Sequence, residues 1–220
     1  MLISYYLPSN NLTNDTLETL YAAPSWTASK IYRKTGIKSR PIAGTELVSD
    51  MAVKAAQNLF DEYNISPQDI DFVLLCTQSP DYFLPTTACL VQERLGIPTT
   101  SGAFDYNLGC SGYIYGLATA KGLLCAGIAK NILLITAETY TKHINPLDRS
   151  TRTVFGDAAA ATYLTIEDID LIGNLYSAPT VKAHKTSSSR QEAWHGHEMT
   201  RPLSSMKMPV ETSAAITTST

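Results

Sequence analysis

Apolar runs and amphipathic stretches alternate along residues 1–165 of the chain. Residues 46–63 place Val48, Ala52 and Leu59 at helical spacing, which predicts an amphipathic helix. Residues 70–76 and 131–137 are almost continuously apolar, as is typical of strands buried on both faces. Such strands joined by helices favour an α/β fold with a mostly parallel mixed sheet. Further strands are expected at 3–7, 102–106 and 154–165, and further helices after Thr13 or Asn14, at 26–34, at 86–95 and at 111–126.

Two of these helices carry more specific expectations. The helix that Thr13 or Asn14 would cap has Leu17 and Leu20 on one face, so both leucines are expected to be buried. The helix at 111–126 is apolar or small on almost every side. A helix without a polar face is typical of a protein interior, so we expect this one to be central and buried.

The charge balance of the chain limits the kind of partner it can bind. Its 220 residues include 17 Lys and Arg against 20 Asp and Glu, which gives a formal net charge of −3. This balance argues against nucleic-acid binding as the main function. No stretch has the length of apolar sequence that a membrane span needs, and the first residues lack the features of a secretory signal, so a cytoplasmic protein is expected.

Four cysteines occur without the spacing of a zinc site. We therefore expect free thiols and no metal or other cofactor. Cys110 stands out, because Gly109 and Gly112 flank it where a predicted strand gives way to a predicted helix. The start of a helix favours a thiolate, and the glycines would let a thioester approach the sulfur. The alternative is a small residue filling a core, which is the reading we favour for the others: Cys76, Cys89 and Cys125.

Residues 3–176 resemble the N-terminal half of the 3-oxoacyl-(acyl carrier protein) synthase III family, in the thiolase superfamily. The resemblance rests on several stretches whose order and spacing agree with the family. They are 35–40, 76–89, 107–117, Ala137-Glu138-Thr139, Asp148-Arg149 and Phe155-Gly156-Asp157 followed by four alanines. The implied fold is the first half of a thiolase-like fold, over residues 1–174, with the nucleophile on a buried helix.

The resemblance implies a reaction in two steps. Cys110 attacks an acyl thioester, usually acyl-CoA, and becomes acylated. Malonyl-acyl carrier protein then loses CO2, and its carbanion attacks the acyl-enzyme to give a 3-oxoacyl product for fatty acid or related acyl-chain biosynthesis. The implied partners are acyl-CoA, acyl carrier protein and a second copy of the chain. Both steps pass through an oxyanion, so backbone N–H donors are expected near Cys110, including its own.

Three further residues match substrate-binding positions of the family. Lys30 and Lys34 fall where the family often has a Trp and an Arg around CoA, and Arg149 matches an adenine-stacking arginine. For these three the alternative is a solvated surface charge. Leu84 falls where a Phe often limits the acyl pocket at the dimer interface, so a longer or branched acyl group is indicated. Trp26 lies outside the motif and is expected to pack as an ordinary aromatic residue.

The catalytic His and Asn of the family belong to the second half of its fold, which has no counterpart in this sequence. His143 is expected to be a solvated loop residue, and His184, His195 and His197 fall outside any family motif. We therefore expect no condensing activity from this chain. Two alternatives stay open: a cysteine acyltransferase that does not condense, and an inert remnant or partner subunit.

The last part of the chain differs in composition. Fifteen of the 44 residues in 177–220 are Ser or Thr, and only four are aliphatic anchors. So few apolar residues predict disorder over 175–220. A shift of one nucleotide would allow these codons to encode the Gly-rich turn and strand that the family has at this point. We therefore hypothesise that residues from about 175 onward are translated out of frame.

Overall fold

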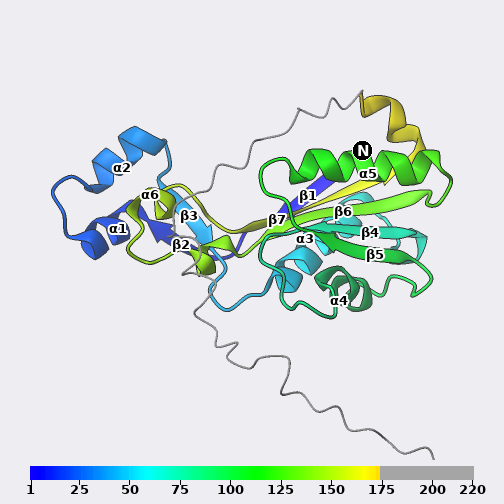
Figure 1. Cartoon of the computed structure of the whole chain (residues 1–220), viewed down its shortest axis with the longest axis horizontal. Helices are drawn as coiled ribbons and strands as arrows, with labels where there is room; N and C mark the ends of the chain where they lie inside the picture. The colour runs from blue at the N-terminus through cyan, green and yellow to red at the C-terminus, as the bar shows by residue number, and fades with distance from the viewer. Residues whose placement is uncertain (174–220) are drawn as a thin grey trace, which may run out of the picture. The chain divides into compact units, whose positions relative to one another are not determined.

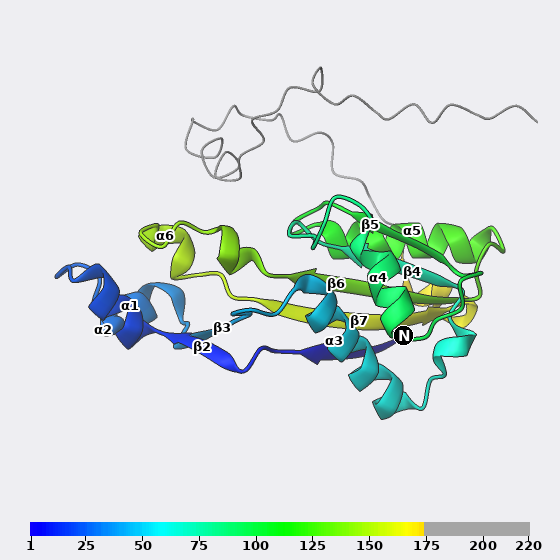
Figure 2. The same ribbon diagram turned by 90° about the horizontal axis from the view of Figure 1, so that it is seen from below.

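The computed structural model describes residues 1–173 of the chain. The expected disorder and frameshift concern residues 175–220 and lie outside this part. Residues 1–173 form a sheet with helices on both faces, and a smaller lobe at one end (Figures 1 and 2). The sheet has five strands, in the order β1 (Leu2–Tyr6), β7 (Ala158–Thr165), β6 (Asn131–Glu138), β4 (Phe72–Cys76) and β5 (Gly102–Tyr106).

The sheet is less parallel than the sequence predicts. β4 pairs in parallel with β5 and β6, whereas β7 pairs antiparallel with both β6 and β1. The chain between β6 and β7 runs out through the lobe and comes back at the same end of the sheet, without a helix that crosses the sheet. A return from the same end produces an antiparallel pair. Only two of the four pairings are therefore parallel, and the expectation of a mostly parallel sheet is wrong.

Two apolar layers sandwich this sheet. On one face α3 (Val48–Tyr63) and α4 (Thr87–Arg94) pack on it, and on the other face α5 (Gly112–Cys125) and the 3-10 helix η3 (Ile166–Leu171) do so. A further 3-10 turn, η1 (Pro67–Asp69), precedes β4. The side chains of Leu74 and Leu133 are completely buried, which confirms the prediction that β4 and β6 are covered on both faces.

Helix α5 is not buried all round. Its buried residues are Gly112, Gly116, Ala120 and Leu124, which repeat every four residues and face the sheet. On other sides Ile114 and Tyr115 are about half exposed, at 50% and 48%. Within the described residues α5 is an outer layer with no second layer packed over it, so the expectation of a central, fully buried helix is wrong.

The other three cysteines differ in burial. Cys76 is buried in β4, as expected for a residue that fills the core. Cys89 in α4 and Cys125 in α5 are exposed, because each lies on the side of its helix that faces away from the sheet. The prediction of free thiols holds for all four cysteines, and the prediction that Cys89 and Cys125 fill the core is wrong.

The lobe has its own small core. An antiparallel strand pair supports three short helices and a 3-10 turn, and the core consists of Leu12, Leu17, Tyr21 and Ile31. Leu20 is exposed and Tyr21 takes the place expected for it, because residues four apart lie on one side of a helix. The elements are β2 (Asn10–Thr13), β3 (Ser39–Ile42), α1 (Asn14–Tyr21), α2 (Ala28–Thr35), η2 (Tyr140–His143) and α6 (Arg149–Arg152).

Two buried charged residues, Arg40 and Asp157, hold together the segments of the lobe and the loop that leads into β7. Arg40 is 2% exposed, and its guanidinium donates to Asn14 Oδ1 at 2.9 Å and to the Thr153 carbonyl oxygen. Asp157 accepts from the Ala43 N–H at 2.8 Å and from the Thr141 N–H at 2.9 Å. Because residues up to Asp157 form this junction, β7 begins at Ala158 and not at 154 as the sequence suggested.

Candidate active site

Cys110 lies in the turn between β5 and α5. Because β4 runs parallel to both β5 and β6, the carboxyl ends of these three strands lie at the same edge of the sheet, where this turn begins. Cys110 is exposed, and no hydrogen bond involves it within residues 1–173. The turn is closed by the Gly112 N–H, which donates to the Gly109 carbonyl oxygen at 2.8 Å. Cys110 stands before α5 as expected, although the helix begins at Gly112, one residue later than the sequence suggested.

The two glycines beside Cys110 serve close packing beneath the turn. A Cβ on Gly112 would overlap the Cys76 sulfur, and a Cβ on Gly109 would come within 3.1 Å of Gln78 Oε1. The amino end of α5 therefore lies directly against the carboxyl end of β4. Substrate access past these glycines, which the sequence suggested, stays a prediction.

The layer under the turn is neutral. The buried Cys76 thiol donates to the Leu108 carbonyl oxygen at 3.2 Å, and the Tyr106 hydroxyl donates to the Gly112 carbonyl oxygen at 2.9 Å. Burial raises the pKa of both Cys76 and Tyr106. Both groups are thus protonated at neutral pH, and the turn is supported by hydrogen bonds and not by ion pairs.

A partly buried carboxyl group, Glu138, lies at the same edge of the sheet and was missed as a site residue from the sequence. Its Oε1 accepts from the Gln78 N–H at 2.6 Å and its Oε2 from the Ser79 hydroxyl at 2.7 Å. Burial raises the pKa of Glu138. The Gln78 side chain faces Gly109, so a single residue separates this carboxyl group from the cysteine turn. The signal available in the sequence was an acidic residue that directly follows a buried apolar run.

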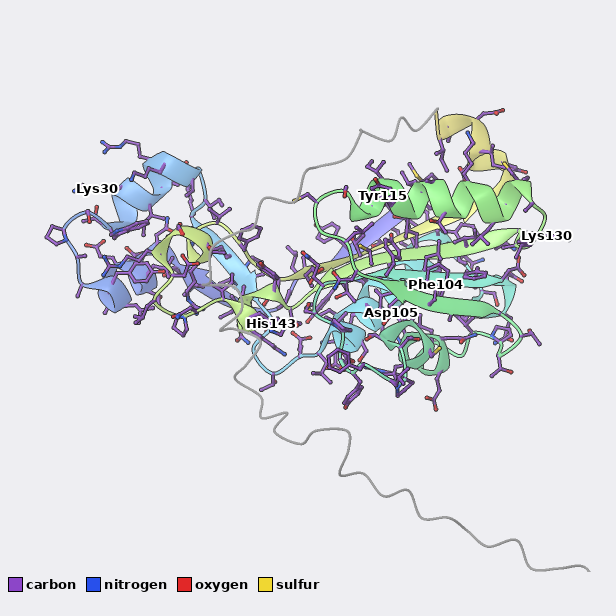
Figure 3. All side chains as sticks on the ribbon, viewed as in Figure 1. Lys30, Phe104, Asp105, Tyr115, Lys130 and His143 are labelled. Atoms are coloured by element: carbon purple, nitrogen blue, oxygen red, sulfur yellow. The ribbon has the colours of Figure 1, made fainter. Side chains whose placement is uncertain are left out.

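A small hollow lies beside the turn. It has a volume of about 180 Å³. Asp105, which is labelled in Figure 3, is on its wall and accepts from the Thr87 N–H at 2.6 Å and the Ala88 N–H at 2.5 Å at the start of α4. Burial raises the pKa of Asp105. The lining residues are Thr77, Pro80, Tyr82, Phe83, Thr86, Asp105, Tyr106 and Asn107.

Three other observations concern residues 1–173. A larger open hollow of about 400 Å³ lies between the end of α3 and Leu95, and none of its lining residues belongs to the cysteine turn. Within the same residues, no three His, Cys, Asp or Glu side chains gather closely enough to hold a metal ion. Nor is any helix there both long and apolar enough to span a membrane.

Known proteins are similar to this chain both in sequence and in fold. The family described as 3-oxoacyl-[acyl-carrier-protein (ACP)] synthase III matches residues 104–175, which include the cysteine turn. A beta-ketoacyl-[acyl-carrier-protein] synthase III from Clostridium perfringens is 42% identical over 166 residues, which are 75% of this chain and 50% of that protein. The chain belongs to the 3-oxoacyl-[acyl-carrier-protein] synthase III family.

Solved synthase III structures agree with this assignment. A crystal structure of a 3-oxoacyl-(acyl-carrier-protein) synthase III superposes with a TM-score of 0.71 at 54% identity and covers 74% of this chain and 48% of that chain. The enzyme from Aquifex aeolicus VF5 gives 0.70 at 40% identity, covering 74% and 52%. The chain thus spans about half the length of the synthase III proteins it matches.

Two of the three basic residues that were predicted to bind substrate each lie over an aromatic ring in the lobe. Lys34 Nζ lies 5.6 Å from the centre of the Trp26 ring, and Arg149 Cζ lies 5.5 Å from the centre of the Tyr21 ring. The two rings meet edge to face with their centres 6.0 Å apart. A row of cation, ring, ring and cation results. Trp26 packs on another aromatic residue as expected, but its contact with Lys34 was missed.

Two other residues predicted to bind substrate, Lys30 and Leu84, take no part in this row, and neither does the loop histidine His143. Lys30 is exposed, and its ammonium donates to the Pro24 carbonyl oxygen at 2.7 Å. Leu84 is 82% exposed on the loop after β4 and is not among the residues that line the 180 Å³ hollow. His143 ends η2 at the surface, near the junction of lobe and sheet, as Figure 3 shows. This agrees with the expectation of a solvated loop histidine.

Proposed function

We propose that Cys110 accepts an acyl group from a thioester, as in the first step of a 3-oxoacyl-(acyl carrier protein) synthase III. The observation that carries this proposal is the placement of an exposed cysteine in the turn before α5, at the carboxyl edge of a sheet that matches the synthase III fold. The Cys110 N–H has no partner within the described residues, so it is available to donate to an oxyanion.

The acylation step balances without an added reagent. The Cys110 sulfur forms a bond to the carbonyl carbon of the donor thioester, and the bond from that carbon to the donor sulfur breaks. The Cys110 proton ends on the departing thiol. The product on the protein is itself a thioester and therefore stays activated towards a second nucleophile.

The synthase III resemblance supports a second step, in which malonyl-acyl carrier protein loses CO2 and attacks the acyl-enzyme. Within residues 1–173 the one histidine is His143, which lies at the surface in η2 and not in the cysteine turn. We infer that the 220-residue chain is acylated but does not condense. The wider assignment is to fatty acid or related acyl-chain biosynthesis in the cytoplasm, with acyl-CoA and acyl carrier protein as partners.

The acyl-CoA donor would lie along the lobe. Lys34 and Arg149 are both exposed beside the aromatic pair of Trp26 and Tyr21, and such cations suit the phosphates and the adenine of CoA. Leu84 would contribute to the acyl pocket in a homodimer. The support for this dimer is that β5 is an edge strand of the sheet and that the loop carrying Leu84 is exposed.

The domain boundary at residue 174 and the out-of-frame origin of residues 175–220 also stand as proposals. The sequence pattern supports both, since the family match ends at residue 175. The nucleotide sequence decides the second proposal. If neither adjacent reading frame encodes the Gly-rich family segment, the out-of-frame origin is wrong.

The test of acylation is labelling by radioactive acyl-CoA. The purified chain should take up label, and the variant Cys110→Ser should not. The matched control is Cys125→Ser, which removes another exposed thiol, at the opposite end of α5, and should leave the label unchanged. Label that stays in Cys110→Ser would show that the acceptor is another residue. No label in the unaltered chain would favour the inert remnant.

The same sample separates the remaining alternatives. Added malonyl-acyl carrier protein should release no 3-oxoacyl product if the chain does not condense, and such a product would overturn that inference. Transfer of the label to an alcohol or an amine would identify a plain cysteine acyltransferase.

A further inference from the structure

Three hydrogen-bond donors in the interior of the lobe have no partner within residues 1–173. Two of them are the Tyr21 hydroxyl and the Nε–H of Arg40, on residues that are 5% and 2% exposed. The third is the Nε–H of Arg152, in the last turn of α6. Folded proteins pair nearly all their buried donors, because an unpaired donor loses its hydrogen bond to water without a replacement. The three groups therefore indicate a partner that residues 1–173 do not supply.

The three donors come from segments that meet around the Tyr21 side chain. Arg40, in β3, donates to the carbonyl oxygen of Thr153, which directly follows Arg152. Burial raises the pKa of the Tyr21 hydroxyl, and the charges of Arg152 and Arg40 lie close enough to act in the opposite direction on this pKa. The effect of burial is the larger one, so the hydroxyl is protonated at neutral pH. All three groups are then donors.

The Tyr21 ring is held on several sides. The Arg149 guanidinium lies over it, with Cζ 5.5 Å from the ring centre, and the Trp26 ring meets it edge to face with the centres 6.0 Å apart. Leu17 and Ile31 complete the small apolar core around it. The hydroxyl is therefore kept in the interior of the lobe and does not turn toward solvent.

Arg40 is buried without a counter-charge. Its terminal nitrogens donate to neutral oxygens, those of Leu12, Asn14 and Thr153. No ion pair within residues 1–173 includes Arg40. Burial lowers the pKa of Arg40, but a guanidinium in a protein does not lose its proton. A positive charge therefore stays in the interior of the lobe, where a negative charge beside it would be stabilising.

The acidic residue nearby, Asp148, does not balance this charge. Its charge acts on the Tyr21 hydroxyl together with those of Arg40, Arg149 and Arg152. Its Oδ1 accepts from backbone N–H groups at the start of α6, and no ion pair within residues 1–173 joins it to Arg149 or Arg152. Three guanidinium groups and a single carboxylate thus surround the Tyr21 hydroxyl, so positive charge is in excess there.

We propose that Tyr21, Arg40 and Arg152 hold a small inorganic anion, of the chloride class, in the interior of the lobe. In Figure 1 the elements that carry the three donors, α1, β3 and α6, lie together in the lobe, and the ion would join them. A water molecule suits three donors less well, because it needs acceptors for its own hydrogens and brings no negative charge. A larger anion would need an opening to solvent, whereas the three donor atoms are buried. The proposal makes no use of Cys110 and is independent of the proposed function.

The test is urea unfolding of the purified full chain at constant ionic strength, with sodium gluconate replaced stepwise by sodium chloride. An ion that binds only the folded chain shifts the folding equilibrium. Each tenfold rise in chloride above its dissociation constant should therefore multiply the ratio of folded to unfolded chain by about ten. Tyr21→Phe removes a donor and Arg152→Gln removes a charge, so each should raise the dissociation constant for chloride by roughly tenfold. The matched controls are Tyr32→Phe and Arg33→Gln, at exposed positions of α2, and should leave the chloride dependence unchanged.

Bromide locates the ion, because it replaces chloride and scatters X-rays anomalously. In a crystal of the full chain grown in sodium bromide, an anomalous peak should lie within hydrogen-bond distance of the Tyr21 hydroxyl and of Arg152 Nε.

Several outcomes would overturn the anion site. One is equal stability of the unaltered chain in chloride and in gluconate, and another is a chloride dependence that Tyr21→Phe leaves intact. A water molecule in place of the bromide peak would overturn it as well. Should Arg152→Gln fail to fold, Tyr21→Phe decides the matter, because it removes only a hydroxyl group. None of these measurements depends on acylation of Cys110, so the proposed function stands or fails separately.

Discussion

The close contact between Gly112 and Cys76 allows a quantitative test of how the cysteine turn is built. Replacing Gly112 with Ala places a methyl group on the Cys76 sulfur, beneath the turn that carries Cys110. An added methyl in a packed interior typically costs about 1–3 kcal/mol. Alanine recovers up to about 1 kcal/mol of helix propensity, and less at the first residue of a helix. Gly112→Ala should therefore lower the free energy of unfolding by about 1–2 kcal/mol.

The second variant removes the obstacle. Cys76→Ala creates space for the methyl group and by itself should cost about 1 kcal/mol, because a buried thiol and its hydrogen bond to the Leu108 carbonyl are lost. In this background Gly112→Ala should be neutral or stabilising. The interaction energy between the two substitutions should therefore be about 2 kcal/mol in favour of the double variant.

The assay is urea unfolding of the unaltered chain, the two single variants and the double variant, followed by circular dichroism. Additive effects, within about 0.5 kcal/mol, would refute the contact between α5 and β4 on which the geometry of the turn depends. The rate of Cys110 acylation supplies a second measure. It should fall in Gly112→Ala and recover in the double variant, because the turn is displaced only in the former.

Three further predictions concern other parts of the fold. Asp148 caps α6, and hydrogen bonds from Thr151 and Ser150 lower its pKa to about 2. Asp148→Ala should thus lower the free energy of unfolding by about 1 kcal/mol at pH 7, and this loss should shrink as the pH falls below the ordinary aspartate pKa towards 2. Urea unfolding at neutral and at acidic pH measures the loss, and an equal loss under both conditions would contradict the prediction. Arg40→Met leaves Asn14 Oδ1 and the Thr153 carbonyl oxygen without the guanidinium donor. This substitution should cost about 3 kcal/mol and speed hydrogen exchange in the lobe, and unchanged exchange would argue against Arg40 as the anchor of the lobe. Brief iodoacetamide treatment should modify the exposed Cys89, Cys110 and Cys125 but spare Cys76 until urea is added, as peptide mass spectrometry would show.

The sequence pattern predicts the elements that apolar periodicity controls. Strand β5 was predicted with its observed bounds, and α3, β4 and β6 were predicted within two residues at each end. The strand pair of the lobe was missed, because Arg40 and Pro41 interrupt any apolar alternation in β3. The start of β7 was placed four residues too early, since a tertiary junction at Asp157 and not local propensity ends the preceding loop.

The burial of α5 shows a second limit of prediction from the sequence pattern. An all-apolar helix indicates that every face has an apolar neighbour, but the sequence does not say where those neighbours are. In residues 1–173 the sheet supplies one neighbour, and Ile114 and Tyr115 on other sides are left exposed. Contacts between residues that are distant in the sequence could not be predicted from the local pattern either. The contact of Lys34 with Trp26 and the network of Glu138 depend on tertiary positions, whereas the position of Cys110 before a helix followed from local sequence.

The central claim is that the Cys110 sulfur carries the acyl group, and peptide mapping tests it most directly. The chain is incubated with an acyl-CoA, digested, and analysed by mass spectrometry before and after treatment with neutral hydroxylamine, which cleaves thioesters. The account predicts an adduct of the acyl mass on the peptide containing Cys110, removed by hydroxylamine. An adduct confined to Cys89 or Cys125, or no adduct on any peptide, would contradict it.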